Sequence, residues 1–180
     1  MRPKIPKRLA AKLTKVRLFL CDVDGVLTDG TVGIGLAQET KTFHIQDGLG
    51  MVLLKKEGIR VGWVSNRPSS ATTMRAEELK IDFLCQLKGG KVAAVQTLLN
   101  EAGCDWDEIC YMGDDVVDLG VLRKAGVAVA VANAIPEAKA EADYVTKLAG
   151  GNGAVRETIE LILRAQGRWD RIVEGYLNLQ

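Results

Sequence analysis

Short apolar runs alternate along the chain with longer segments in which apolar residues recur every three or four positions. The short runs predict buried strands, and they lie at residues 16–22, 60–65, 82–86, 109–112, 127–131 and 144–146. The longer segments predict helices that begin near residues 7, 49, 70, 90, 116, 136 and 152. Because strands and helices alternate, the pattern predicts a Rossmann-like α/β fold, with a doubly wound parallel sheet and helices on both faces.

One stretch departs from this alternation, directly after the first predicted strand. Residues 31–34 and 41–45 are extended segments on either side of a polar connection at 35–40, which is the pattern of a β-hairpin. We expect this hairpin, about residues 31–46, to project over the edge of the sheet at which the strands end.

The chain is organised in three parts. Residues 1–15 form a basic arm with a short helix, residues 16–166 form the α/β domain, and residues 167–180 form a C-terminal tail. A chain of 180 residues is long enough for one domain with a hydrophobic core.

Charge is balanced overall but uneven along the chain. The 24 basic and 23 acidic residues give a formal net charge of +1, which argues against nucleic-acid binding, because that activity needs a concentrated basic surface. The first 15 residues carry six basic residues and no acidic one. We interpret them as a solvated arm leading into an amphipathic helix, and contact with phosphate or a membrane surface is the alternative.

Two features predict a cytoplasmic protein without membrane contact. No apolar run is long enough to span a bilayer, and no apolar core follows the N-terminal charges as it would in a signal peptide. The four cysteines lack CxxC spacing, and three of them lie in apolar runs, which is typical of reduced core residues. A single histidine in the chain argues against a zinc site.

Polar side chains suited to one reaction follow the first, second and fourth predicted strands and begin one helix. They are Asp22, Asp24, Ser65, Lys91, Asp114 and Asp115. The carboxyl ends of parallel strands meet at one edge of a sheet, so these side chains are expected to lie together. Carboxylates can hold Mg²⁺, whereas lysine and serine can bind a phosphate, so the set predicts a phosphoryl-transfer site. The alternative for each aspartate is a turn or capping role.

These residues also stand in a familiar order. The segments Asp22-Val-Asp-Gly-Val-Leu-Thr and Gly113-Asp-Asp-Val-Val-Asp, with Ser65 and Lys91 between them, resemble the four motifs of the haloacid dehalogenase superfamily of phosphohydrolases. The resemblance implies that Asp22 is a nucleophile that forms an aspartyl-phosphate. It also implies that Asp24 is the general acid and then the base.

The same resemblance implies roles for the remaining motif residues. Ser65 and Lys91 would bind the phosphate. Mg²⁺ would be held by Asp22, Asp114 and the backbone carbonyl of Asp24, with Asp115 and Asp118 in outer positions near the metal. For Asp118 an ordinary place on a helix surface is an equal alternative.

Short distances between the motifs leave no room for a cap domain. The segments 22–30, 41–48, 142–146 and 150–157 are similar to the capless sugar-acid phosphatases typified by 3-deoxy-D-manno-octulosonate 8-phosphate phosphatase. This resemblance implies hydrolysis of an eight-carbon 3-deoxy-ulosonic acid phosphate, and a nine-carbon sialic-acid-like 9-phosphate is the alternative. It also implies a homotetramer in which the hairpins form a central barrel and a neighbouring subunit helps to close the site.

Candidate substrate contacts lie outside the four motifs. They are Asn66, Arg67, Asp47 and Arg156. Arg67 and Arg156 could bind a substrate carboxylate, or could be surface charges. Asn66 stands where the family usually has glycine, and Asp47 is expected first to cap a helix. The segment 150–153, Gly-Gly-Asn-Gly, could cradle an anion or simply form a turn.

Two other classes of function share parts of this pattern. A phosphoacceptor signalling domain also uses strand-end acids and a lysine, but it lacks an acid at the position of Asp24. A regulatory domain descended from a phosphatase typically loses motif residues, whereas all four motifs are present here. Asp24 therefore favours an enzyme.

Overall fold

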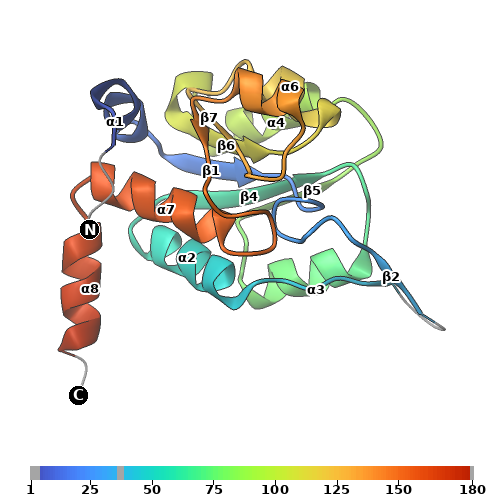
Figure 1. The fold of residues 1–180 in the computed structure, drawn as a ribbon, viewed down its shortest axis with the longest axis horizontal. Helices are drawn as coiled ribbons and strands as arrows, with labels where there is room; N and C mark the ends of the chain where they lie inside the picture. The colour runs from blue at the N-terminus through green and yellow to red at the C-terminus, as the bar shows by residue number, and fades with distance from the viewer. Residues whose placement is uncertain (1–4, 36–38, 179–180) are drawn as a thin grey trace.

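A parallel sheet forms the centre of the molecule. The computed structural model describes residues 5–35 and 39–178, and within them six strands pair in the order β5-β4-β1-β6-β7-β8 (Figure 1). The strands are β1 Leu18–Cys21, β4 Arg60–Ser65, β5 Phe83–Gln86, β6 Ile109–Gly113, β7 Val127–Ala130 and β8 Tyr144–Val145. All five neighbouring pairs are parallel. The predicted fold class is thus confirmed.

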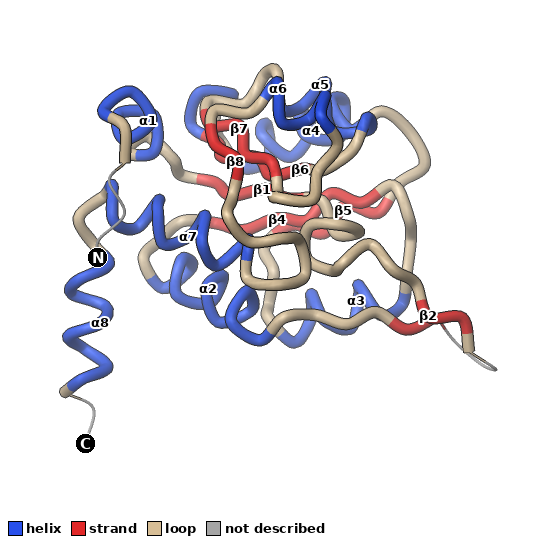
Figure 2. The backbone as a smooth tube through the Cα atoms, in the orientation of Figure 1, coloured by secondary structure: helices blue, strands red, loops and turns tan. Residues whose placement is uncertain are grey.

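Helices cover both faces of this sheet (Figures 1 and 2). On one face lie α2 Ile45–Lys56, α3 Ser70–Glu78 and α7 Ala154–Ala165, and on the other lie α4 Lys91–Ala102, α5 Leu119–Leu122 and α6 Pro136–Glu141. Short helical turns at Trp106–Glu108 (η1) and Val116–Asp118 (η2) flank β6. This double covering explains why the strands are mostly apolar, with every residue of the inner strands β1 and β6 buried.

Two helices lie at the ends of the chain. The predicted N-terminal helix is present as α1 Lys7–Leu13, and its Leu9 and Leu13 are buried; residues 1–4 of the basic arm lie outside the described part. The C-terminal tail contains α8 Trp169–Leu177, which extends away from the sheet beyond α7 (Figure 1). Its first residue, Trp169, is buried and packs against the guanidinium groups of Arg156 and Arg164.

The hairpin is shorter than predicted. Strands β2 Gly33–Ile34 and β3 Glu39–Thr40 pair antiparallel, whereas the predicted second strand at 41–45 was wrong. Phe43 stacks on the buried Trp63 with ring centroids 6.1 Å apart, and this contact draws the chain back to the body before α2 begins at Ile45. Residues 36–38 of the predicted connection lie outside the described residues.

Helix α2 also starts earlier than the sequence suggested. Asp47 was expected to cap a helix beginning near residue 49, but it lies inside the first turn, after the N-cap residue His44. Its carboxylate accepts hydrogen bonds from the backbone N–H groups of Gly153 (3.3 Å) and Arg156 (2.7 Å). Asp47 therefore joins α2 to the first turn of α7.

In the part of the chain that the structure describes, no helix has the length and apolarity needed to cross a bilayer.

Candidate active site

Three strand ends place the predicted side chains at one edge of the sheet. Asp22 directly follows the central strand β1, Ser65 is the last residue of β4, and Asp114 directly follows β6. The strands β4 and β6 flank β1 on opposite sides. The strand order therefore runs outward from β1 first towards one edge of the sheet, through β4 and β5, and then towards the other, through β6, β7 and β8. Open α/β sheets bind their ligands at such a switch point, beyond the carboxyl ends of the strands.

Lys91, the first residue of α4, joins two of the aspartates. Its Nζ lies 2.9 Å from Asp22 Oδ1 and 2.7 Å from Asp118 Oδ1, and the side chain is 1% exposed. Burial lowers the pKa of Lys91, but the attraction of both carboxylates outweighs burial and leaves that pKa above its ordinary value. Lys91 is therefore a charged ammonium held against Asp22.

Asp118 is buried and binds Lys91. From the sequence, a position near the metal and a position on a helix surface were equal alternatives for this residue. Its Oδ1 accepts a hydrogen bond from the Tyr111 hydroxyl (2.6 Å), and its Oδ2 accepts from the backbone N–H groups of Asp114 (3.0 Å) and Asp115 (3.3 Å). Asp118 thus fixes both Lys91 and the loop after β6. Sequence reasoning missed Tyr111, because a tyrosine in an apolar strand gives no signal beyond core packing.

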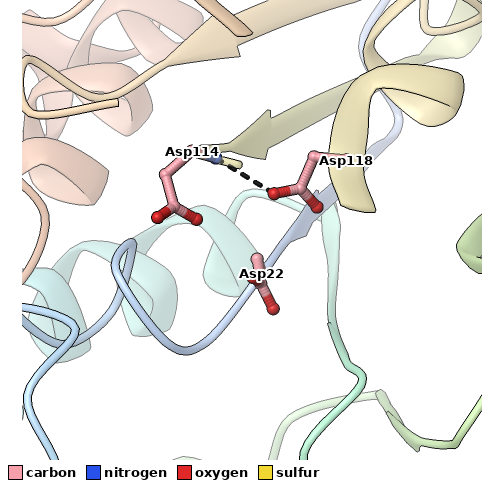
Figure 3. A group of neighbouring side chains, drawn as sticks. All are labelled: Asp22, Asp114 and Asp118. Atoms are coloured by element: carbon pink, nitrogen blue, oxygen red, sulfur yellow. Dashed lines mark hydrogen bonds between the residues drawn. The ribbon is translucent and has the colours of Figure 1, made fainter. Parts of the chain in front are cut away.

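The side chains of Asp22, Asp114 and Asp118 lie close together (Figure 3). Each offers an oxygen within 4.8 Å of the others. Burial, together with repulsion from neighbouring carboxylates, raises the pKa of Asp22 to about 6 and that of Asp114 to about 7. Asp114 Oδ1 is buried without a hydrogen-bond partner among the described residues. A hard, oxygen-preferring cation such as Mg²⁺ fits this set, because it would occupy the orphaned oxygen and relieve the repulsion.

Asp115 does not belong to this group, although we predicted it near the metal. Its side chain is exposed, and its Oδ1 accepts a hydrogen bond from the backbone N–H of Val116 (2.6 Å), which caps η2. Asp118, three residues later, takes the third place because η2 turns its side chain inward.

Gly25 makes room for Asp114. Its φ is +90°, and a Cβ on this residue would lie 2.1 Å from Asp114 Oδ2. Any side chain here would both strain the backbone and displace the Asp114 carboxylate. The glycine that follows Asp24 in the first motif is thus required by the contact between the β1 and β6 loops.

The Asp24 carboxylate contacts two side chains outside the aspartate cluster of Asp22, Asp114 and Asp118. Its Oδ2 is 3.5 Å from Ser65 Oγ, and its Oδ1 is 2.7 Å from Lys41 Nζ. The Ser65 hydroxyl accepts a hydrogen bond from the backbone N–H of Arg67 (3.0 Å). Lys41 was not predicted as a site residue, since it lies in the segment predicted as a hairpin and in none of the four motifs.

The two residues after Ser65 remain candidates for substrate contact. Arg67 is half exposed, and its Nη2 lies 2.6 Å from Glu39 Oε2, which raises the pKa of Arg67. Asn66 is partly buried, and its Oδ1 has no hydrogen-bond partner within residues 5–35 and 39–178. Both groups could therefore exchange or gain a partner when a ligand binds.

The side chains of Asp47 and Arg156 contact other parts of the protein, away from the aspartate cluster. Asp47 is 1% exposed, and the backbone of α7 occupies its carboxylate. Arg156 Nε lies 2.9 Å from Glu160 Oε1, and its guanidinium lies 4.9 Å from the ring centre of Trp169. The structure thus does not bring these two predicted substrate contacts to the aspartate cluster.

The glycine-rich segment 150–153 supports the first motif and does not form an open anion cradle. A Cβ on Gly150 would lie 1.7 Å from the carbonyl oxygen of Gly25, and one on Gly151 would lie 2.4 Å from the Asp29 nitrogen. The N–H groups of Gly150 and Gly151 already donate to Asn133 Oδ1 and to the Val26 carbonyl. These glycines are needed because two loops pack backbone against backbone.

Comparison with known proteins gives a consistent result. Residues 84–157 match the model of the haloacid dehalogenase-like hydrolase family. The chain is 40% identical over 161 residues to the 3-deoxy-D-manno-octulosonate 8-phosphate phosphatase of Escherichia coli K12, covering 89% of this chain and 86% of that protein.

Solved structures extend this similarity to three dimensions. The 3-deoxy-D-manno-octulosonate 8-phosphate phosphatase of Moraxella catarrhalis, in complex with magnesium ion, phosphate ion and a KDO molecule, superposes with a TM-score of 0.93 at 38% identity, covering 96% of this chain and 99% of that one. The enzyme of the same name from Yersinia pestis gives 0.90 at 36% identity, covering 92% and 90%.

Proposed function

Because the chain belongs to the 3-deoxy-D-manno-octulosonate 8-phosphate phosphatase family, within the haloacid dehalogenase-like hydrolases, we propose that it hydrolyses 3-deoxy-D-manno-octulosonate 8-phosphate to the free sugar acid and phosphate. The observation that carries this proposal is the buried Asp22–Lys91–Asp118 triad beside the orphaned oxygen of Asp114. It supplies a carboxylate nucleophile, a fixed positive charge and a place for a divalent cation at one sheet edge.

In the first half of the proposed reaction, the Asp22 carboxylate attacks phosphorus. The bond between phosphorus and the sugar oxygen breaks as the bond to Asp22 forms, and Asp24 gives its proton to the departing oxygen. Lys91 lowers the repulsion between the phosphate and Asp22, because its ammonium lies 2.9 Å from the attacking carboxylate. The Ser65 hydroxyl would donate to a phosphate oxygen.

In the second half, water attacks the phosphorus of phospho-Asp22. Asp24, now a carboxylate, takes a proton from that water, and the P–O bond to Asp22 breaks to restore the free enzyme. A Mg²⁺ ion held by Asp22, Asp114 and the Asp24 backbone would supply positive charge that favours negatively charged groups approaching one another.

Phosphate release from two sugar phosphates tests the proposal. With Mg²⁺ present, we expect kcat/KM for 3-deoxy-D-manno-octulosonate 8-phosphate to exceed that for a nine-carbon sialic-acid-like 9-phosphate by about tenfold or more, as one well-placed recognition contact can provide. The opposite preference would assign the nine-carbon substrate. Equal slow rates on both, or an accumulating phospho-Asp22 that does not turn over, would contradict the proposal.

The hairpin is the element that we propose to mediate a homotetramer. Ile34, on β2, is 91% exposed, and Ile45, just beyond the hairpin, is 74% exposed. Large apolar side chains so exposed on a projecting element are typical of an association surface. A neighbouring subunit there could also shield a site that has no cap domain.

Replacement of Ile34 by aspartate is expected to shift the tetramer towards smaller species, because a charge would be desolvated in the interface. Light scattering coupled to size-exclusion chromatography measures this change. Val145→Asp, on the edge strand β8 far from the hairpin, is the matched control and should leave the mass unchanged. A wild-type protein that is a fully active monomer would rule out the assembly.

We further propose a cytoplasmic location. The four cysteines, Cys21, Cys85, Cys104 and Cys110, are all free thiols in the structure. Free buried thiols are usual in a reducing compartment.

A further inference from the structure

Lys41 is a buried lysine that contacts the acid/base residue. Its side chain is 0% exposed although it lies only one residue beyond the projecting strand β3. The ammonium lies 2.7 Å from Asp24 Oδ1 and 3.7 Å from Glu39 Oε1, and it donates a 3.3 Å hydrogen bond to Thr72 Oγ1. Burying an ammonium group costs free energy unless the group is paired, so Lys41 needs these oxygen partners to remain buried.

Asp24 is the charged partner that lies nearest to the ammonium among these contacts. Asp24 Oδ1 is 2.7 Å from Lys41 Nζ, whereas Glu39 Oε1, at 3.7 Å, lies beyond hydrogen-bond distance. The closest ion pair of Lys41 is therefore the one with the acid/base side chain of the proposed reaction.

The same contacts tie Asp24 to the base of the hairpin. Glu39 belongs to β3 and also binds Arg67, whose Nη2 is 2.6 Å from Glu39 Oε2. Thr72 is a fully buried residue of α3. A short chain of charges thus connects the acid/base residue, the hairpin and the loop that follows Ser65.

We propose that Lys41 is a positioning residue that holds the Asp24 carboxyl group where it can protonate the departing sugar oxygen. This inference rests on the proposed function. In that step the P–O bond to the sugar breaks, the bond from Asp22 to phosphorus forms, and the proton passes from Asp24 to the sugar oxygen. Without Lys41, Asp24 can rotate away from the line of proton transfer, and an alkoxide leaves slowly when it is not protonated.

The choice of leaving group separates this role from simple support of the fold. An alkyl phosphate needs a proton donor, whereas p-nitrophenolate leaves as a stable anion. The parameter kcat/KM reports only the steps through phosphoryl transfer to Asp22, so for p-nitrophenyl phosphate it does not depend on Asp24 as an acid.

We expect Lys41→Met, which keeps the length of the side chain but removes the charge, to lower kcat/KM for 3-deoxy-D-manno-octulosonate 8-phosphate by about 10²-fold. The value for p-nitrophenyl phosphate should change by less than about threefold, since protonation by a general acid contributes little there. Lys41→Arg keeps the charge and should restore part of the loss. Lys88→Met, in the exposed loop before α4, is the matched control and should change neither value.

Equal losses on both substrates would overturn the inference and indicate a structural role. So would an unchanged kcat/KM for the sugar phosphate. If Lys41→Met does not fold, Lys41→Arg and Thr72→Val provide the same comparison with smaller selective losses expected, and a loss that is not selective would again overturn it. Absence of sugar-phosphate hydrolysis by the wild-type protein would instead remove the proposed function itself.

Discussion

Asp22→Asn is expected to lower kcat for phosphate release by at least about 10³-fold, because an amide cannot act as the nucleophile that forms the phosphoenzyme. The substitution keeps the size of a side chain that is 6% exposed, so the fold should persist. Phosphate release at saturating substrate measures the effect. Intact-protein mass spectrometry of the quenched reaction should show a phosphorylated species for the wild type and none for the variant.

Asp105→Asn is the matched control for this experiment. Asp105 is an exposed N-cap of η1, before β6 and therefore at the opposite edge of the sheet. Asparagine caps a helix about as well as aspartate, so both activity and stability should stay near those of the wild type. Full activity of Asp22→Asn would refute the covalent mechanism.

Mg²⁺ is expected to stabilise the protein, and more strongly at pH 8 than at pH 5. In the metal-free protein the pKa of Asp22 is raised to about 6 and that of Asp114 to about 7, both above the values of an unfolded chain. The folded state therefore binds more protons than the unfolded state between about pH 4 and 7, and its free energy of unfolding falls as pH rises through this window. A bound cation removes this penalty, because it stabilises the ionised carboxylates.

Thermal unfolding at both pH values, with EDTA and with Mg²⁺, measures the difference. We expect the rise in Tm on adding Mg²⁺ to be several degrees at pH 8 and much smaller at pH 5, since about 1 kcal/mol shifts Tm by a few degrees in a domain of this size. Chelation should also abolish phosphate release. The same rise in Tm at both pH values would contradict a site built from these two carboxylates.

Two glycine variants test whether the Mg²⁺-dependent rise in Tm depends on the position of Asp114. Gly25→Ala should remove the Mg²⁺-dependent rise in Tm at pH 8, because the new Cβ would collide with Asp114. Gly58→Ala has similar backbone strain at φ +79°, but nothing lies within 4 Å of its Cβ. It should therefore lower stability by about 1–2 kcal/mol and keep the response to Mg²⁺.

Asp115 and Asp118 illustrate where motif reasoning stops. Both are acids within five residues of the end of β6, and the family resemblance placed both near the metal, with a helix-surface position as an equal alternative for Asp118. Local geometry separates the two, since η2 leaves Asp115 as an exposed cap and encloses Asp118 against Lys91 and Tyr111. The orientation of a side chain in a tight turn depends on hydrogen bonds that spacing does not specify.

The sequence by itself determined the α/β class. It also predicted that Asp22, Asp24, Ser65, Lys91 and Asp114 meet at one edge of the sheet, which is where the structure places them. It could do so because apolar runs predict buried strands, and because parallel strands bring their carboxyl ends to one edge whatever the details of packing.

Only the tertiary structure decided which other charged residues lie beside this candidate site. The Asp47 carboxylate accepts a hydrogen bond from the backbone of Gly153, which lies 106 residues later in the chain, at the start of α7. Lys41, next to the hairpin, lies against Asp24. A local pattern contains no information about such pairs, because each depends on how helices and loops distant in sequence pack against each other. Once packing has brought two such residues together, they pair because an unpaired buried charge is energetically costly.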